Sequence, residues 1–142
     1  MNFLPVLRDL AQAYQAFEDY SSRHVRAMGL TPVQFDVIAT LGNQTPMTFK
    51  ELGEKTLISK SSLTGVVERM SNKGMLSISE NEDDARSQKI KLTAKGQKLF
   101  AKTFNAHSKH LSLAFENLSE RQLKDIADSF KTFKSIFLHS RT

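Results

Sequence analysis

The sequence predicts a mainly α-helical protein with one two-stranded β-ribbon near its middle. Three observations support this prediction: apolar residues recur at helical spacing along most of the chain, capping patterns separate these stretches, and apolar residues alternate with polar ones only around residues 76–92. The 142 residues suffice for one domain with its own hydrophobic core. Cysteine is absent, which excludes disulfides, thiolate nucleophiles and a thiol-based redox switch.

A long amphipathic helix is expected over residues 3–28. Its large apolar side chains recur three or four positions apart along most of this stretch: Phe3, Leu7, Leu10, Tyr14, Phe17 and Val25. Gly29 is placed to end the helix. Because the apolar residues share one side, the helix needs another apolar surface to cover them.

The stretch LTPVQF predicts the start of a second helix. Thr31 is the expected N-cap, Pro32 the first helical residue, and Gln34 the partner in a Thr-x-x-Gln capping box. We expect this helix to continue to Leu41, just before a Gly-Asn pair that ends it.

A third and a fourth helix follow. Thr48 and Glu51 predict a second capping box and therefore a short third helix. The fourth helix is expected to open at Ser59 and to end at Gly74. Its apolar residues are spaced so that they face a core: Leu63, Val66, Val67 and Met70.

A β-hairpin is expected next, because apolar and polar residues alternate in two short segments. The apolar members are Leu76, Ile78, Ile90 and Leu92. They flank an acidic loop that contains Glu80, Glu82, Asp83 and Asp84. The inner face of the hairpin is expected to cover the helices.

The chain should be helical from about residue 94 to its end. One apolar stripe is predicted at Phe100, Phe104, Leu111, Phe115 and Leu118. After a third capping box at Ser119 and Gln122, a second stripe consists of Leu123, Ile126, Phe130, Phe133 and Phe137. Eight of the ten phenylalanines lie in residues 1–30 or 94–142, more apolar surface than the short middle helices can cover, so we expect a homodimer.

Residues 31–92 are thus ordered as three helices and a two-stranded ribbon, which is a winged helix-turn-helix arrangement. Opposite its core stripe, the fourth helix begins with small hydrogen-bonding side chains, as a helix that enters the DNA major groove requires. The candidate DNA-binding residues of this helix are Ser59, Lys60, Ser61, Ser62, Thr64 and Arg69. A net charge of +5 is compatible with a nucleic-acid partner.

The sequence resembles the MarR (multiple antibiotic resistance regulator) family of bacterial transcription factors. The resemblance rests on LTPVQFDVIATL, on TFKELGEKTLISKSSLTGVVERMSNKGML, and above all on DDARSQKIKLTAKG, which is similar to the family's Asp-x-Arg wing and Leu-Thr-x-x-Gly. It implies one MarR-like domain over 1–142, with a winged helix-turn-helix DNA-binding region at 31–92. The family uses its helical ends, here 1–30 and 94–142, for dimerisation.

The resemblance also implies roles in the acidic loop. Arg86 would enter the minor groove, where the negative potential of a narrow groove favours a guanidinium, and Asp84 would hold its fork by bidentate bonds. Lys89 and Lys91 point away from the core and are expected to contact phosphates. The family often carries a larger polar residue where this chain has Gly65, so either the helix approaches DNA closely there or other residues provide specificity.

Family members often bind aromatic or amphipathic compounds between the dimer helices and the winged region. This implies a candidate effector site made of Tyr20, Arg23, His24, Met28 and Phe35. A competing hypothesis is a zinc-responsive regulator that uses His24, His107 and His110, although no acid lies near the HSKH motif. A third is a winged-helix module that binds protein instead of DNA.

An enzyme is not expected. The chain has no Gly-rich phosphate loop and no HExxH, and no pattern supplies a base with an orienting acid. No cofactor is expected, and no sequence window resembles a membrane span or a secretion leader, which favours a cytoplasmic protein. We therefore predict a ligand-responsive repressor that binds a pseudo-palindromic DNA operator as a homodimer.

Overall fold

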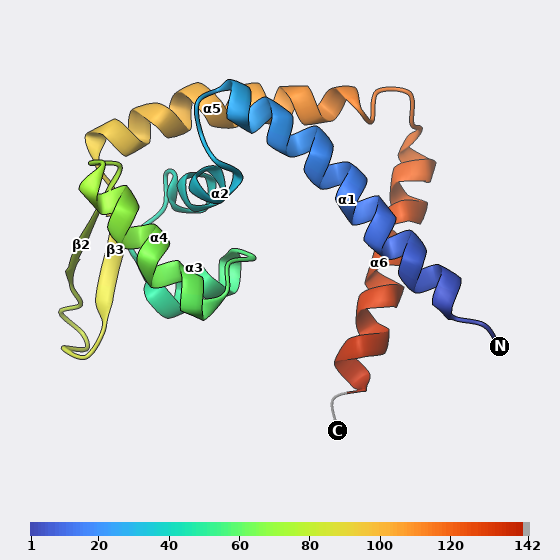
Figure 1. The fold of residues 1–142 in the computed structure, drawn as a ribbon, viewed down its shortest axis with the longest axis horizontal. Coiled ribbons are helices and arrows are strands. Elements are labelled where there is room, and N and C mark those ends of the chain that lie inside the picture. The colour runs from blue at the N-terminus through green and yellow to red at the C-terminus, as the bar shows by residue number, and fades with distance from the viewer. Residues whose placement is uncertain (141–142) are drawn as a thin grey trace. The chain divides into compact units, whose positions relative to one another are not determined.

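The computed structural model describes residues 1–140, so the last two residues of the predicted 94–142 region lie outside the described part. The elements are α1 (Leu4–Ala27), α2 (Pro32–Leu41), β1 (Met47–Thr48), α3 (Phe49–Lys55), α4 (Lys60–Asn72), β2 (Leu76–Glu80), β3 (Gln88–Leu92), α5 (Ala94–Leu113) and α6 (Glu120–His139) (Figure 1). The predicted mainly α-helical winged fold is confirmed. The chain divides into two compact units, 1–109 and 110 onward, which are described separately.

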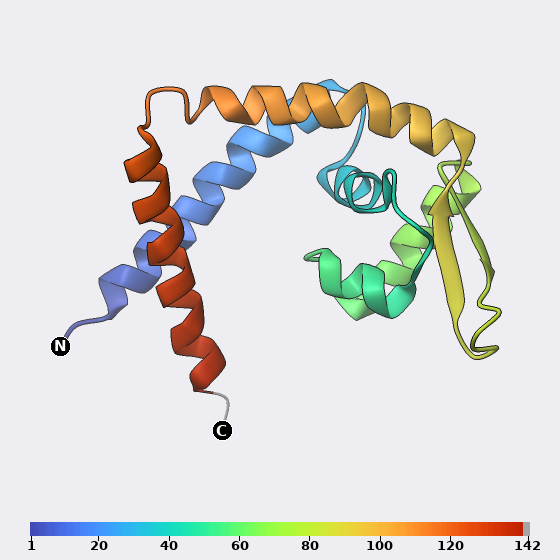
Figure 2. The same cartoon turned by 180° about the vertical axis from the view of Figure 1, so that it is seen from behind.

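The hydrophobic core of the first unit lies among α2, α3, α4 and the small sheet, which gather together in both views (Figures 1 and 2). The end of α1 contributes Val25 and the following turn contributes Leu30. All four apolar residues predicted for the inner side of α4 are buried. Helix α4 is therefore fixed to the core along one side, which leaves its other side exposed.

The sheet has three antiparallel strands in the order β1-β3-β2. The predicted hairpin is β2 and β3, with Ile78 opposite Ile90 and Leu76 opposite Leu92. Strand β1 was not predicted, because two residues are too short for any alternation to be visible. It pairs Met47 with Ile90, and it makes β3 the central strand.

Local capping signals agree with most helix ends. Thr31 and Gln34 form the reciprocal capping box of α2, and Gly29 ends the preceding turn with a φ of +85°. The predicted box of α3 is only half formed. Thr48 Oγ1 accepts the Glu51 N–H at 3.1 Å, but the Glu51 carboxylate bonds the Thr48 hydroxyl instead of its backbone. Thr48 also belongs to β1, whose backbone pairs with β3.

The predicted apolar stripe after residue 94 is partly wrong. Helix α5 ends at Leu113, so Phe115 and Leu118 lie beyond it, and Phe115 is exposed. The buried residues of α5 are Gly96, Thr103 and His107. Their burial was not predicted, because threonine and histidine are not core residues by composition alone.

Helix α6 belongs to the second unit and begins at the predicted capping box, with Ser119 Oγ accepting the Gln122 N–H at 3.1 Å. None of its residues is buried, although Phe130 and Phe137 recur on one side. Within residues 1–140, no helix has the length and apolar character needed to cross a bilayer.

Candidate nucleic-acid interface

The exposed side of α4 presents a row of short polar side chains. All six residues predicted for DNA contact are exposed: Ser59, Lys60, Ser61, Ser62, Thr64 and Arg69. At the N-terminus of the helix the Ser59 hydroxyl bonds those of Ser62 at 3.0 Å and Ser61 at 3.2 Å. These hydroxyls stand where the first helical N–H groups are unpaired, so the end of the helix is rich in hydrogen-bonding groups without bulky side chains.

The wing loop between β2 and β3 holds Arg86 far out in solvent. Its side chain is 95% exposed, and its Nε lies 3.6 Å from Asp84 Oδ1. The same oxygen accepts the Arg86 backbone N–H at 3.0 Å. Asp84 therefore fixes the backbone beneath Arg86 and does not form the expected bidentate pair with its fork. The fork itself remains available to a partner.

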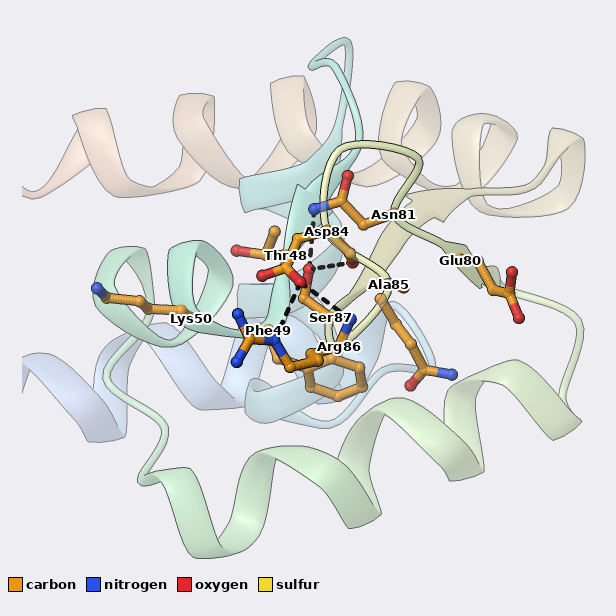
Figure 3. Close-up of a pocket in the computed structure, with 10 residues that line it drawn as sticks. Thr48, Phe49, Lys50, Glu80, Asn81, Asp84, Ala85, Arg86 and Ser87 are labelled. Atoms are coloured by element: carbon orange, nitrogen blue, oxygen red, sulfur yellow. Dashed lines mark hydrogen bonds and ion pairs between the residues drawn. The ribbon is translucent and has the colours of Figure 1, made fainter.

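Asn81 stabilises the wing loop through its side chain, a role that the sequence did not predict. Asn81 is 9% exposed, and its Nδ2 donates to Ser87 Oγ at 2.8 Å (Figure 3). Its Oδ1 accepts the Asp83 N–H at 3.1 Å. Ser87 in turn bonds the Asp84 carbonyl. An asparagine ahead of a turn is a usable signal, because its side chain readily bonds the backbone two residues on.

Two recesses flank this loop. One, of about 650 Å³, is lined on one side by Thr48 and Lys50 and on the other by Arg86 and Gln88 (Figure 3). The other, of about 270 Å³, brings Lys89 and Lys91 together with the carboxylates of Glu80, Glu82 and Asp83. The two lysines thus share their surface with acids, which partly offset their positive charge.

Asp36 of α2 lies beside the turn that precedes α4. Its Oδ2 is 3.5 Å from the Leu57 backbone nitrogen, which donates to it. Burial raises the pKa of the Asp36 carboxyl, the Leu57 hydrogen bond acts to lower it, and the nearby charge of Glu18 on α1 raises it further. This half-buried carboxylate therefore links α2 to the turn before α4, and Glu18 of α1 adds a repelling charge.

The candidate effector residues are only partly brought together. His24 and Phe35 both contact His107, which is 3% exposed: His24 Nδ1 lies 2.9 Å from His107 Nδ1, and the Phe35 ring meets the imidazole edge-on at 4.7 Å between centroids. Ser21 Oγ bonds the other nitrogen of His107 at 3.0 Å. Met28 packs against the core, whereas Tyr20 and Arg23 are exposed.

These histidines do not form a metal centre. Among the residues that the structure describes, no three His, Cys, Asp or Glu side chains converge so that they could hold an ion. His24 and His107 hydrogen-bond each other, and Ser21 takes the remaining nitrogen of His107. The zinc-responsive alternative built on His24, His107 and His110 is therefore wrong.

The apolar side of α4 is fixed to a three-helix core, and its polar side is exposed beside a wing that carries an arginine in its loop. This arrangement defines the winged helix-turn-helix DNA-binding class. A model of the MarR family matches residues 28–87. The chain belongs to the MarR family. It is a DNA-binding transcriptional regulator and not an enzyme, which also overturns the protein-interaction alternative.

Two curated relatives illustrate this assignment. The HTH-type transcriptional regulator MhqR of Bacillus subtilis is 26% identical over 122 residues, which cover 86% of this chain and 84% of the relative. The homoprotocatechuate degradative operon repressor of Escherichia coli is 32% identical over 91 residues, covering 64% and 62% of the two chains.

Two solved structures share the fold. A mutant MarR from E. coli complexed with operator DNA has a TM-score of 0.82 and 19% identity, covering 92% of this chain and 94% of that one. NadR in complex with 4-hydroxyphenylacetate has a TM-score of 0.74 and 23% identity, with 90% and 91% covered. At these identities the likeness concerns the fold alone.

Proposed function

We propose that this regulator is a cytoplasmic homodimeric repressor that binds a pseudo-palindromic operator and is released by a small aromatic or amphipathic effector. In this proposal residues 31–92 bind DNA, and residues 1–30 and 94–142 form the dimer. The observation that carries it is the exposed hydroxyl-rich side of α4, whose opposite side is fixed in the core. The name of the E. coli relative, an operon repressor, supports repression over activation.

The proposed contacts divide by chemistry. Base edges in the major groove are contacted by the N-cap Ser59 and by Ser61, Ser62, Thr64 and Arg69 of α4, while Lys60 contacts phosphate. Arg86 inserts into the adjacent minor groove, and Asp84 positions it through the backbone bond. Lys89 and Lys91 add phosphate contacts. Two copies related by a twofold axis would read half-sites about 10 bp apart.

The dimer is supported by apolar surface that the single chain leaves exposed. Large exposed apolar residues on α1 and α6 include Leu10, Phe17, Ile126, Phe130 and Phe137. Exposed apolar surface on a helix marks an interaction site, and a twofold dimer would bury both copies of each such surface.

The effector proposal rests on the neighbour solved with 4-hydroxyphenylacetate and on the surroundings of His107. An aromatic acid would meet apolar walls and one cation in the candidate effector residues, which are Tyr20, Arg23, His24, Met28 and Phe35. An effector acts only through different affinities for two states, so we propose that it favours a dimer with wrongly spaced recognition helices. If saturating aromatic carboxylates change neither DNA affinity nor the melting temperature, this ligand class is excluded.

Operator binding is tested by fluorescence anisotropy with the upstream intergenic DNA over a salt series, with a scrambled duplex beside it. We expect preferential, steeply salt-dependent binding by the wild type, and a weaker affinity with a salt slope reduced by about one for Arg86→Ala. Arg121→Ala, an exposed arginine at the start of α6, is the matched control and should bind as the wild type does. Equal, weak binding to upstream, scrambled and selected genomic fragments would contradict the proposal.

A further inference from the structure

Gly65 lies in the interior of the recognition helix, on its partly exposed side. Ser61 precedes it by one turn and Arg69 follows by one turn, so the three residues share one face. Apart from proline, glycine is the least favourable residue inside a helix. A glycine at the centre of a candidate reading face therefore requires a physical reason.

The structure supplies that reason in Arg69. A Cβ added at Gly65 would lie 3.1 Å from Arg69 Nη1 and 3.8 Å from both Cζ and Nη2. The guanidinium group therefore lies directly over the bare backbone of Gly65. Arg69 reaches back toward the N-terminus of its own helix, the direction that helical side chains favour.

A second helical glycine, in α3, gives a comparison for this contact. At Gly53 of α3 an added Cβ would meet only Leu63 Cδ2, at 3.5 Å, which is an ordinary van der Waals distance. Gly53 could become alanine without moving its neighbour. At Gly65 the guanidinium would have to move by a few tenths of an ångström, so the missing Cβ allows the Arg69 fork to lie against the helix backbone.

The Arg69 fork is also available for a ligand. Neither ion pair found within residues 1–140 involves Arg69. Its position over Gly65 brings five N–H donors toward the part of the helix that carries the short hydroxyls of Ser61, Ser62 and Thr64. A planar guanidinium that is not engaged in an ion pair can bind the O6 and N7 acceptors of guanine in the major groove.

We propose that Gly65 is a seat that positions the Arg69 guanidinium for bidentate recognition of one guanine in each operator half-site. Arg69 is then the specificity-determining residue of α4, and Gly65 is a positioning residue that acts through it. This inference rests on the proposed function, because it assumes that α4 enters the major groove.

The test is a double-mutant cycle on duplexes in which each operator guanine is replaced in turn by 7-deazaguanine, which lacks the N7 acceptor. In the wild type we expect one position per half-site at which this replacement weakens binding at least about fivefold. Arg69→Ala should be insensitive to that same replacement. Gly65→Leu, which fills the seat with a good helix former, should lose the same sensitivity.

The double variant should bind no worse than Arg69→Ala alone, because the seat has no role without the arginine. Gly53→Ala serves as the glycine control and should keep the wild-type pattern. Circular dichroism and melting temperatures verify that all variants fold.

Two results would overturn the inference while leaving operator binding intact. One is a wild type insensitive to every 7-deazaguanine, which would mean that Arg69 makes no bidentate contact with guanine. The other is a double variant whose loss is the product of the two single losses, which would mean that the two residues act independently. A wild type that prefers no operator over scrambled DNA would instead remove the proposed function, and the inference with it.

Discussion

Helices α4 and α6 are both amphipathic, but they differ in how the chain uses their apolar sides. In the 13 residues of α4, four apolar residues are buried, whereas none of the 20 residues of α6 is buried. Apolar spacing therefore identifies which side of a helix seeks cover, but not where that cover comes from. For α4 it comes from the same chain; for α6 we propose that it comes from a second copy.

The same contrast separates two leucines near the recognition helix. Leu52 of α3 is fully buried, while Leu57, in the turn before α4, is 86% exposed. We expect Leu52→Ala to lower the free energy of unfolding by about 2–5 kcal/mol, because it removes buried methyl groups and leaves a cavity. Leu57→Ala should change it by less than about 0.5 kcal/mol. Urea unfolding followed by circular dichroism measures both, and similar losses for the two variants would contradict the assigned core.

The exposed side of α6 should matter for assembly instead. We expect Phe130→Glu to weaken the dimer by about 2 kcal/mol, roughly 30-fold in Kd, because it places a charge in an apolar interface. Sedimentation equilibrium measures this effect. Ser129→Glu makes the same charge change at the neighbouring position and should have little effect. Unchanged association of Phe130→Glu would mean that α6 is not the dimer surface.

Within the wing, two residues support the loop that carries Arg86: Asn81, which is buried, and Asp84, which is exposed. Asn81→Ala removes two side-chain hydrogen bonds in a buried position and should destabilise the loop by about 1–2 kcal/mol. Asp84→Ala removes one exposed backbone bond and a long ion pair, so its effect should be smaller. Amide hydrogen exchange of residues 81–88 and operator affinity should rank the variants in this order, and the reverse ranking would show that Asp84 is the main support.

The smallest expected effect is the pH dependence contributed by Asp36. Because burial raises its pKa above the ordinary value of 3.8, the folded state holds this proton more tightly than the unfolded chain. Its contribution to stability is therefore greatest below that value and declines as the pH rises through the raised pKa. Asp36→Asn keeps an oxygen for the Leu57 N–H and removes the titration, so its stability relative to wild type should increase from pH 3.5 to pH 7. Parallel unfolding curves for the two proteins would exclude this role.

Much of the fold was predictable because its signals are local. The caps at Thr31 and Ser119 satisfy backbone groups within three residues, so the sequence alone places these helix starts. The alternation of apolar and polar residues around Ile78 and around Ile90 likewise predicts the hairpin and its inner face. Resemblance added the roles of Asp84 and Arg86, and the structure revised how Asp84 makes contact.

The sequence by itself determined which segments are helices, which sides are apolar, and that a helix with a polar face is followed along the chain by a hairpin whose loop carries an arginine. Only the tertiary structure decided the pairing of Met47 with Ile90, the burial of Asn81 and the bond between Ser21 and His107, which are 86 positions apart. The physical reason is the sequence distance over which each kind of interaction acts. Caps and periodicity depend on neighbours within a turn or two, whereas burial and pairing depend on what the folded chain brings from elsewhere.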